Sequence, residues 1–111
     1  MTRQVEHQAL TEGVYYILLA LHTPLHGYGI MQYVKEVSHE RLNLGPGTLY
    51  GAINTMVEKK WIEAVATETD NRKKEYVITE LGKEVVSEEI KRLQELVHNG
   101  LKITGSEEHE V

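Results

Sequence analysis

Apolar residues recur at intervals of three and four near the start of the chain, which is the spacing of one face of a helix. These residues are Leu10, Val14, Ile17, Leu18 and Leu21. They predict a helix from roughly residue 4 to residue 22, which the following Pro24 prevents from continuing. Apolar residues at positions 28, 30, 34 and 37 predict a second helix, which starts near His26 and stops before Arg41.

A third helix has the clearest start signal of the chain. Gly45 suits the N-cap position and Pro46 the first helical position, where a missing N–H costs nothing. The predicted buried stripe consists of Leu49, Ile53, Met56 and Val57. The opposite face carries small or polar residues, namely Thr48, Gly51, Asn54, Thr55 and Glu58. A surface so free of bulk allows another molecule to approach this helix closely.

Two extended segments come next, residues 61–68 and residues 75–79. The first has apolar residues at positions 62, 64 and 66, and the second is rich in residues that favour strands. The polar stretch between them, residues 69–74, is typical of a turn. The pattern therefore predicts a β-hairpin with a basic tip.

A fourth helix is predicted from about residue 80 to residue 98, with Thr79 as its cap. Its apolar stripe consists of Val86, Ile90, Leu93 and Val97. Asn99 and Gly100 supply a stop signal. We expect a winged-helix unit over residues 1–79, a dimerisation helix within residues 80–104, and a disordered acidic tail over residues 105–111.

The predicted order of elements is three helices, a hairpin and a long helix. The fold class is therefore mainly α with a small β-hairpin, and the elements are those of a winged helix-turn-helix followed by a long C-terminal dimerisation helix. In that fold the third helix lies in the DNA major groove and the wing reaches the backbone.

The amino-acid composition argues against several other classes of protein. A chain of 111 residues forms one small domain, and the absence of cysteine excludes disulfides and Cys-ligated zinc. No signal peptide or membrane-spanning run is present, so we expect a cytoplasmic protein with no membrane partner. The histidines lack partners at ligand spacing, and no nucleophile with a base or phosphate-binding glycine loop occurs. We therefore expect no metal, no cofactor and no enzymatic activity.

The net charge of −5 is unusual for a protein that binds nucleic acid, so its distribution matters. Residues 84–111 hold seven acidic and three basic residues, which leaves a balance of only −1 for residues 1–83. Two basic clusters stand out against this near-neutral part of the chain. They are Lys59 and Lys60, and Arg72, Lys73 and Lys74.

Three segments carry a more specific pattern: LLAL at 18–21 leading to HGYGI at 26–30, GTLYGAI at 47–53, and RKKEYVITELG at 72–82. In this order and spacing they resemble the PadR family of transcriptional regulators, and the resemblance covers roughly residues 9–98. It implies a winged-helix domain with a C-terminal dimerising helix, which binds operator DNA as a dimer and commonly represses adjacent genes. The family usually has proline where this chain has Gly51, and glycine where it has Lys60. Some relatives bind small aromatic ligands, so an effector of unknown identity is a further possible partner.

The side chains expected to contact DNA lie on the third helix and the hairpin. Asn54 suits an adenine edge, Thr48 and Thr55 a thymine methyl or a phosphate, and Tyr50 a phosphate. The alternatives are that Asn54 and Thr55 are merely solvated and that Tyr50 packs against the first helix. The basic tip is the better candidate for phosphate binding. The expected DNA-contacting set is Thr48, Tyr50, Asn54, Thr55, Lys59, Lys60, Arg72, Lys73 and Lys74.

The apolar stripe of the fourth helix predicts a homodimer, because a small domain has little room to cover it. We expect the interface to include Leu10, Val14, Val86, Ile90, Leu93 and Val97. Packing of the stripe against its own domain is the alternative. A two-fold dimer places two recognition helices about 34 Å apart, which predicts a palindromic operator. The competing function is a winged-helix module that binds protein or senses a ligand and has little affinity for DNA.

Overall fold

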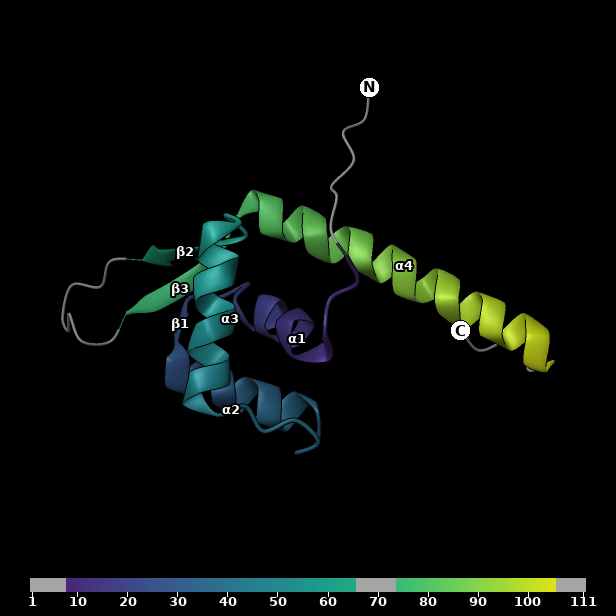
Figure 1. Ribbon diagram of the computed structural model, residues 1–111, viewed down its shortest axis with the longest axis horizontal. Helices are drawn as coiled ribbons and strands as arrows, with labels where there is room; N and C mark the ends of the chain where they lie inside the picture. Colours follow the sequence, from purple (N-terminus) through teal and green to yellow (C-terminus); the bar gives the residue numbers. More distant parts are fainter. Residues whose placement is uncertain (1–7, 66–73, 106–111) are drawn as a thin grey trace, which may run out of the picture.

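The computed structural model describes residues 8–65 and 74–105 (Figure 1). In these ranges the chain forms four helices and a three-stranded antiparallel sheet. Helices α1, α2 and α3 gather on one side of the molecule beside the sheet, and α4 runs away from them (Figure 1). The expected class, mainly helical with a small sheet in a winged-helix arrangement, is confirmed.

Helix α1 spans Glu12–Ala20, and Thr11 is its N-cap. The Thr11 hydroxyl oxygen accepts the N–H of Val14 at 3.1 Å, which satisfies one of the free donors at the helix start. The predicted start near residue 4 is wrong for residues 8–11, which are described and not helical. Leu10 belongs to the apolar periodicity, but it packs from the segment before the helix.

Helix α2 spans Gly27–Val37, and helix α3 spans Pro46–Glu58. The Gly29 N–H donates to Nδ1 of His26, the N-cap of α2, at 3.3 Å. Gly45 caps α3 and proline occupies its first turn, as the sequence predicted.

The sheet has three strands in the order β1-β3-β2. Strands β2 (Ile62–Val65) and β3 (Glu75–Ile78) form the predicted hairpin, with Ile62 opposite Ile78. Strand β1, only Leu25–His26, pairs with the other edge of β3 and was not predicted. It ties the turn after α1 to the sheet.

Helix α4 spans Glu80–Thr104 and is capped by the side chain of Thr79, as predicted. Its end is not at residue 98: the helix passes through Asn99 and Gly100 and stops at Gly105, which has the left-handed φ of 77°. Only its first half packs on the domain, through Val85, Val86 and Glu89 among others. The second half extends beyond the rest of the chain (Figure 1). No helix of the described residues combines the length and the apolar character needed to cross a bilayer.

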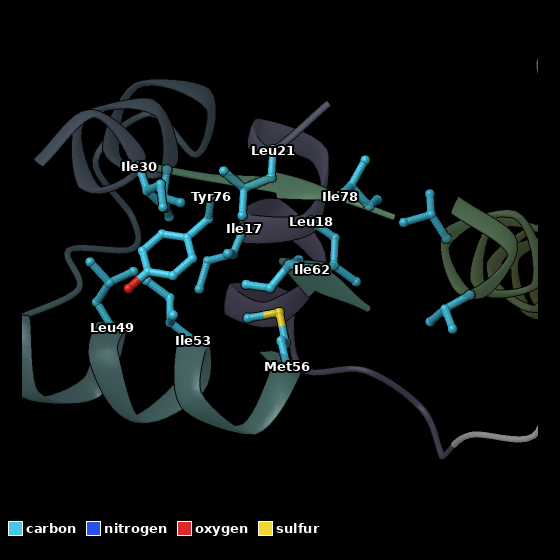
Figure 2. Close-up of a cluster of buried hydrophobic side chains, with 13 residues drawn as sticks. Ile17, Leu18, Leu21, Ile30, Leu49, Ile53, Met56, Ile62, Tyr76 and Ile78 are labelled. Carbon is cyan, nitrogen blue, oxygen red and sulfur yellow. The ribbon is translucent and has the colours of Figure 1, made fainter. Parts of the chain in front are cut away.

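The core lies where α1, α2 and α3 meet the sheet. Figure 2 shows the Tyr76 ring of β3 among Ile30 of α2 and Leu49 and Ile53 of α3. The buried face of α3 comprises Leu49, Ile53 and Met56. Val57, which the sequence analysis placed in the buried stripe of α3, is in fact 39% exposed.

Candidate nucleic-acid interface

The outer face of α3 is open to solvent over its whole length. Thr48, Gly51, Asn54, Thr55 and Glu58 are all exposed, while the opposite face forms the core. The helix therefore has the predicted small, polar surface, and it contacts β2 of the hairpin.

The chemistry of this face is set by Asn54 and Thr55. The Asn54 amide offers a donor and an acceptor side by side, which is the pattern that pairs with an adenine edge. The Thr55 hydroxyl donates to the carbonyl oxygen of Gly51 at 3.2 Å. With its proton used inside the helix, Thr55 can face DNA only as an acceptor or through its methyl group, so a phosphate oxygen does not suit it.

Tyr50 is 44% exposed and lies beside the start of α2. Its hydroxyl occupies the space that a Cβ atom on Gly27 would fill. The alternative expected for Tyr50 was packing against the first helix, and the neighbour that the structure shows is Gly27 at the start of α2. Tyr50 also contributes to the raised pKa of Tyr76, although burial of the Tyr76 hydroxyl is the larger cause.

Lys59 and Lys60 form the corner between α3 and β2, and both are exposed. The Nζ atom of Lys59 lies 5.4 Å from the centroid of the Trp61 ring, a cation–π distance. Lys60 has a φ of 66°, the left-handed region that favours glycine. The Thr79 hydroxyl donates to the Lys60 carbonyl oxygen at 2.7 Å and holds this corner against α4.

The basic tip falls mostly outside the described residues. Arg72 and Lys73 belong to the segment 66–73, of which the structure says nothing, and Lys74 is exposed next to β3. Because β3 pairs with β2 and β2 contacts α3, Lys74 belongs to the same packed unit as the exposed face of α3.

A polar pair that the sequence did not point to lies on α2. Gln32 donates through Nε2 to the Tyr28 hydroxyl at 3.0 Å, and Tyr28 is among the most exposed large side chains. The spacing of Tyr28 helped to predict helix α2, but it gave no sign of the hydrogen bond with Gln32.

The residues expected at a dimer interface separate into two groups. Val86 is buried in the core of its own chain, and Leu10 and Val14 are half-buried against that core. Ile90 and Val97 are 38% and 50% exposed, and Leu93 is half-buried. Two further apolar residues of α4 are exposed and were not predicted, Leu96 by 52% and Ile103 by 86%.

A buried carboxylate joins the segment before α1 to α4. Glu89 is 1% exposed and forms two bonds with Arg92, Nε to Oε1 at 3.0 Å and Nη2 to Oε2 at 2.6 Å. The Leu10 N–H also donates to Glu89 Oε2 at 3.4 Å. The hydrogen bonds that Arg92 donates to Glu89 raise the pKa of Arg92 above its usual value.

Across the described ranges, no group of three or more histidine, aspartate, glutamate or cysteine side chains is arranged to hold a metal ion. The polar groups on the exposed face of α3 are the Asn54 amide, the hydroxyls of Thr48 and Thr55 and the carboxylate of Glu58.

Comparison with known proteins places this geometry in a family. The family model of the PadR-like transcriptional regulators matches residues 15–88. A 37.1 kDa protein from transposon TN4556 of Streptomyces fradiae is 36% identical over 66 residues, which are 60% of this chain and only 18% of that protein. The chain thus spans less than a fifth of this relative.

Two solved structures have the same fold. A PadR-like transcription factor from Bacteroides fragilis has a TM-score of 0.67 at 28% identity, over 81% of this chain and 87% of that one. A transcriptional regulator from Clostridium thermocellum has a TM-score of 0.67 at 20% identity, over 81% and 88%. The family match runs from α1 into α4 and covers more than half of the sequence, so the chain belongs to the PadR-like family of transcriptional regulators.

Proposed function

We propose that this protein acts in the cytoplasm as a homodimeric repressor that binds a palindromic operator through α3 and the basic tip of the hairpin. The observation that carries the proposal is the exposed, small and polar face of α3, with Asn54 and Thr48 uncovered by the described part of the chain. A helix of this kind, beside a hairpin that it contacts, matches the way winged helices enter the major groove.

In this proposal some of the DNA-contacting side chains bind base edges and the others bind phosphates. Asn54 reads a base edge, and Thr48 and Thr55 contact thymine methyl groups or base donors. Tyr50, Lys59, Lys60 and the tip cations Arg72, Lys73 and Lys74 contact phosphates. Because α3 has no arginine or lysine before its C-cap, backbone contacts and DNA shape supply much of the affinity.

The proposal of a homodimer rests on the exposed apolar residues of α4 from Ile90 onward. Ile90, Leu96, Val97 and Ile103 are exposed on a helix that extends beyond the domain (Figure 1). Apolar side chains gathered on an unpartnered helix gain free energy when a second copy covers them. A two-fold axis through α4 then presents two copies of α3 to one side of the DNA.

Fluorescence anisotropy tests DNA binding directly. Labelled duplex from upstream of the protein's own gene is titrated at two salt concentrations, with a shuffled duplex of equal composition as control. We expect tighter binding to the upstream duplex and weaker binding at the higher salt concentration. Equal, weak binding to both duplexes contradicts the proposal and favours a module that binds protein or a ligand instead.

Sedimentation tests the dimer. The wild-type protein is expected to sediment as a dimer at micromolar concentration, and the double variant Leu96→Glu/Val97→Glu as a monomer. Ser87→Ala, an exposed change on the packed half of the same helix, is the matched control and remains dimeric. If the wild-type protein sediments as a monomer at that concentration, the proposed two-fold dimer is wrong.

A further inference from the structure

Glu58 is the charged residue of α3, and it lies on the helix face that is proposed to meet DNA. The helix, Pro46–Glu58, contains no other acidic or basic side chain. A carboxylate on this face repels the phosphates of an approaching duplex, so it weakens binding to DNA of any sequence. The DNA contacts proposed above give Glu58 no role that offsets this repulsion.

Glu58 lies on the side of α3 that is opposite the core. Successive residues of a helix are about 100° apart around its axis, so Glu58 is about 180° from Leu49, which is fully buried. Gly51 lies within about 20° of the direction of Glu58 and has no side chain. Glu58 also has the longest side chain of the exposed face. Its carboxylate is therefore the group of this face best placed to reach into a groove.

The described part of the chain gives Glu58 no structural role. Its side chain is exposed and forms no hydrogen bond or ion pair with the residues of the described ranges. Glu58 is also the last residue of α3, where the negative end of the helix dipole disfavours an acidic side chain. The Nζ atom of the adjacent Lys59 lies instead over the Trp61 ring, 5.4 Å from its centroid. A side chain that is unfavourable both for its helix and for phosphates is expected at a position that forms a specific contact.

The major groove of DNA offers a suitable partner for a carboxylate. Cytosine presents there only its exocyclic amino group, which is a donor, whereas guanine presents two acceptors and thymine an acceptor and a methyl group. A carboxylate only accepts hydrogen bonds, so it pairs with the cytosine amino group and is repelled by the acceptors of guanine and thymine. Adenine presents a donor beside an acceptor, which suits the amide of Asn54 better.

Asn54 and Glu58 are spaced to bind neighbouring bases. They are one helical turn apart, which places them about 6 Å from each other along the helix axis. Successive bases of a DNA strand rise by about 3.4 Å, so the two side chains reach bases within about two steps of each other. An operator half-site bound in this way contains an adenine and a cytosine close together.

We propose that Glu58 determines operator specificity by accepting a hydrogen bond from the amino group of a cytosine near the adenine that Asn54 binds. This role rests on the proposed function, because it requires α3 to lie in the major groove. The carboxylate then acts in two ways. It stabilises the complex with cytosine, and it disfavours each duplex that has an acceptor at the same position, which is a common source of specificity.

Selection from a library of randomised duplexes tests base readout by Glu58. The wild-type protein, Glu58→Gln and Glu58→Asp each bind the same library, and the bound duplexes are sequenced. The wild type is expected to favour cytosine at one position of each half-site by at least about fivefold, the lower limit for one mismatched base pair. Glu58→Gln is expected to change the preferred base there to adenine, because an amide pairs with adenine. Glu58→Asp, whose carboxylate is one methylene group shorter, is expected to lose the preference for cytosine.

Anisotropy titrations with the shuffled duplex measure the repulsion separately. Glu58→Gln is expected to bind this duplex up to about fivefold more tightly at low salt, because it removes a like charge from beside the phosphates. Glu58→Asp keeps the charge and is expected to bind with the wild-type affinity. Glu95→Gln, which removes an exposed carboxylate of α4, is the matched control and is expected to leave the selected bases and the affinity unchanged.

A negative result at Glu58 is distinguishable from failure of the proposed function. If the wild-type protein and Glu58→Gln select the same bases, readout by Glu58 is wrong, even where the affinity for the shuffled duplex rises. If the wild-type protein binds no DNA, the proposed function is wrong and the role of Glu58 with it. Thermal unfolding shows that the variants are folded, which we expect because Glu58 is exposed.

Discussion

The hydroxyl of Tyr50 on α3 fills the space beside Gly27 at the start of α2 that any other residue would need for its Cβ atom. This contact fixes the recognition helix relative to the helix before it. It also leaves no room for a Cβ atom at Gly27 unless the Tyr50 side chain moves.

Replacement of Gly27 by alanine is therefore expected to push Tyr50 out and to lower the free energy of unfolding by about 1–3 kcal/mol, the usual cost of overpacking. In a Tyr50→Ala background the same change should cost much less, because the overlapping group is gone. Chemical denaturation of the four proteins of this cycle measures the coupling. Additive effects would show that the contact does not hold α3.

Gly82 and Gly100 both lie in α4 but have opposite surroundings. A Cβ atom at Gly82 would overlap the backbone carbonyl oxygen of Trp61, which cannot swing aside, whereas nothing lies within 4 Å of one at Gly100. We expect Gly82→Ala to destabilise the protein by about 3 kcal/mol or more. Gly100→Ala should stabilise it by up to about 1 kcal/mol, because alanine favours the helix.

Thermal and chemical unfolding of Gly82→Ala and Gly100→Ala measures whether each substitution lowers or raises the free energy of unfolding. A destabilised Gly100→Ala protein that also dissociates would indicate that a second chain packs against this position. An unaffected Gly82→Ala protein would contradict the close packing of α4 on the corner at Trp61.

Lys60 has a strained backbone conformation. Its φ of 66° lies in the left-handed region that favours glycine. A side chain in the left-handed region costs about 1–2 kcal/mol, partly offset by the greater freedom of glycine in the unfolded chain. Lys60→Gly is therefore expected to raise the free energy of unfolding by roughly 0.5–1 kcal/mol. Lys60→Ala, which removes the same charge but keeps a Cβ atom, should give no such gain.

Local signals in the sequence were sufficient for much of this fold. The caps Gly45 and Thr79 and the hairpin were predicted correctly, because each depends on neighbouring residues. Strand β1 was missed because two residues carry no periodicity and owe their conformation to the distant β3. The start of α1 was placed too early because Leu10 continues the apolar spacing while its N–H bonds to Glu89, far along the chain.

The candidate site, like the fold, was predicted where it depends on local spacing and missed where it depends on distant contacts. Spacing alone identified the exposed face of α3, but it assigned Val57, which is 39% exposed, to the core. Helix α4 continues through Asn99 and Gly100 although both are weak helix formers, since one glycine costs only about 1 kcal/mol in a helix of this length. An open groove between the segment before α1 and one side of α3 was not predicted, because it depends on how these two parts of the chain pack together.

Glu89 is expected to stabilise the junction between α4 and the segment that contains Leu10. Glu89→Gln keeps the shape but weakens the paired bonds to Arg92, whose side chain is 35% exposed. Because water partly screens the Arg92 side chain, we expect the free energy of unfolding to fall by about 1–3 kcal/mol. That loss is smaller than the cost of breaking a fully buried pair. Hydrogen exchange at the Leu10 amide should also accelerate.

The matched control is Glu88→Gln, the neighbouring carboxylate in a more exposed pair with Lys91. It should change stability by no more than about 0.5 kcal/mol and leave the Leu10 amide protected. Equal effects of the two substitutions would mean that Glu89 does not anchor the segment.

The basic tip of the hairpin should contribute to DNA affinity through charge alone. Replacing Arg72, Lys73 and Lys74 by alanine is expected to weaken binding to operator and shuffled duplexes alike, since phosphates carry no sequence information. Each lost phosphate contact lowers the log–log salt slope by about 0.9, so the triple variant should lose up to about three units. Anisotropy titrations over a series of salt concentrations measure the slope.

A second triple variant removes the same charge elsewhere. Lys83, Lys91 and Lys102 are exposed on α4 and lie outside the proposed DNA-contacting set. Changing them to alanine alters the net charge of the protein by the same amount, so any general electrostatic effect appears in both proteins. If the tip itself contacts phosphates, the log–log salt slope falls much further in the hairpin variant than in the α4 variant. Equal slopes in the two variants would leave α3 and the corner lysines as the whole of the DNA-binding surface.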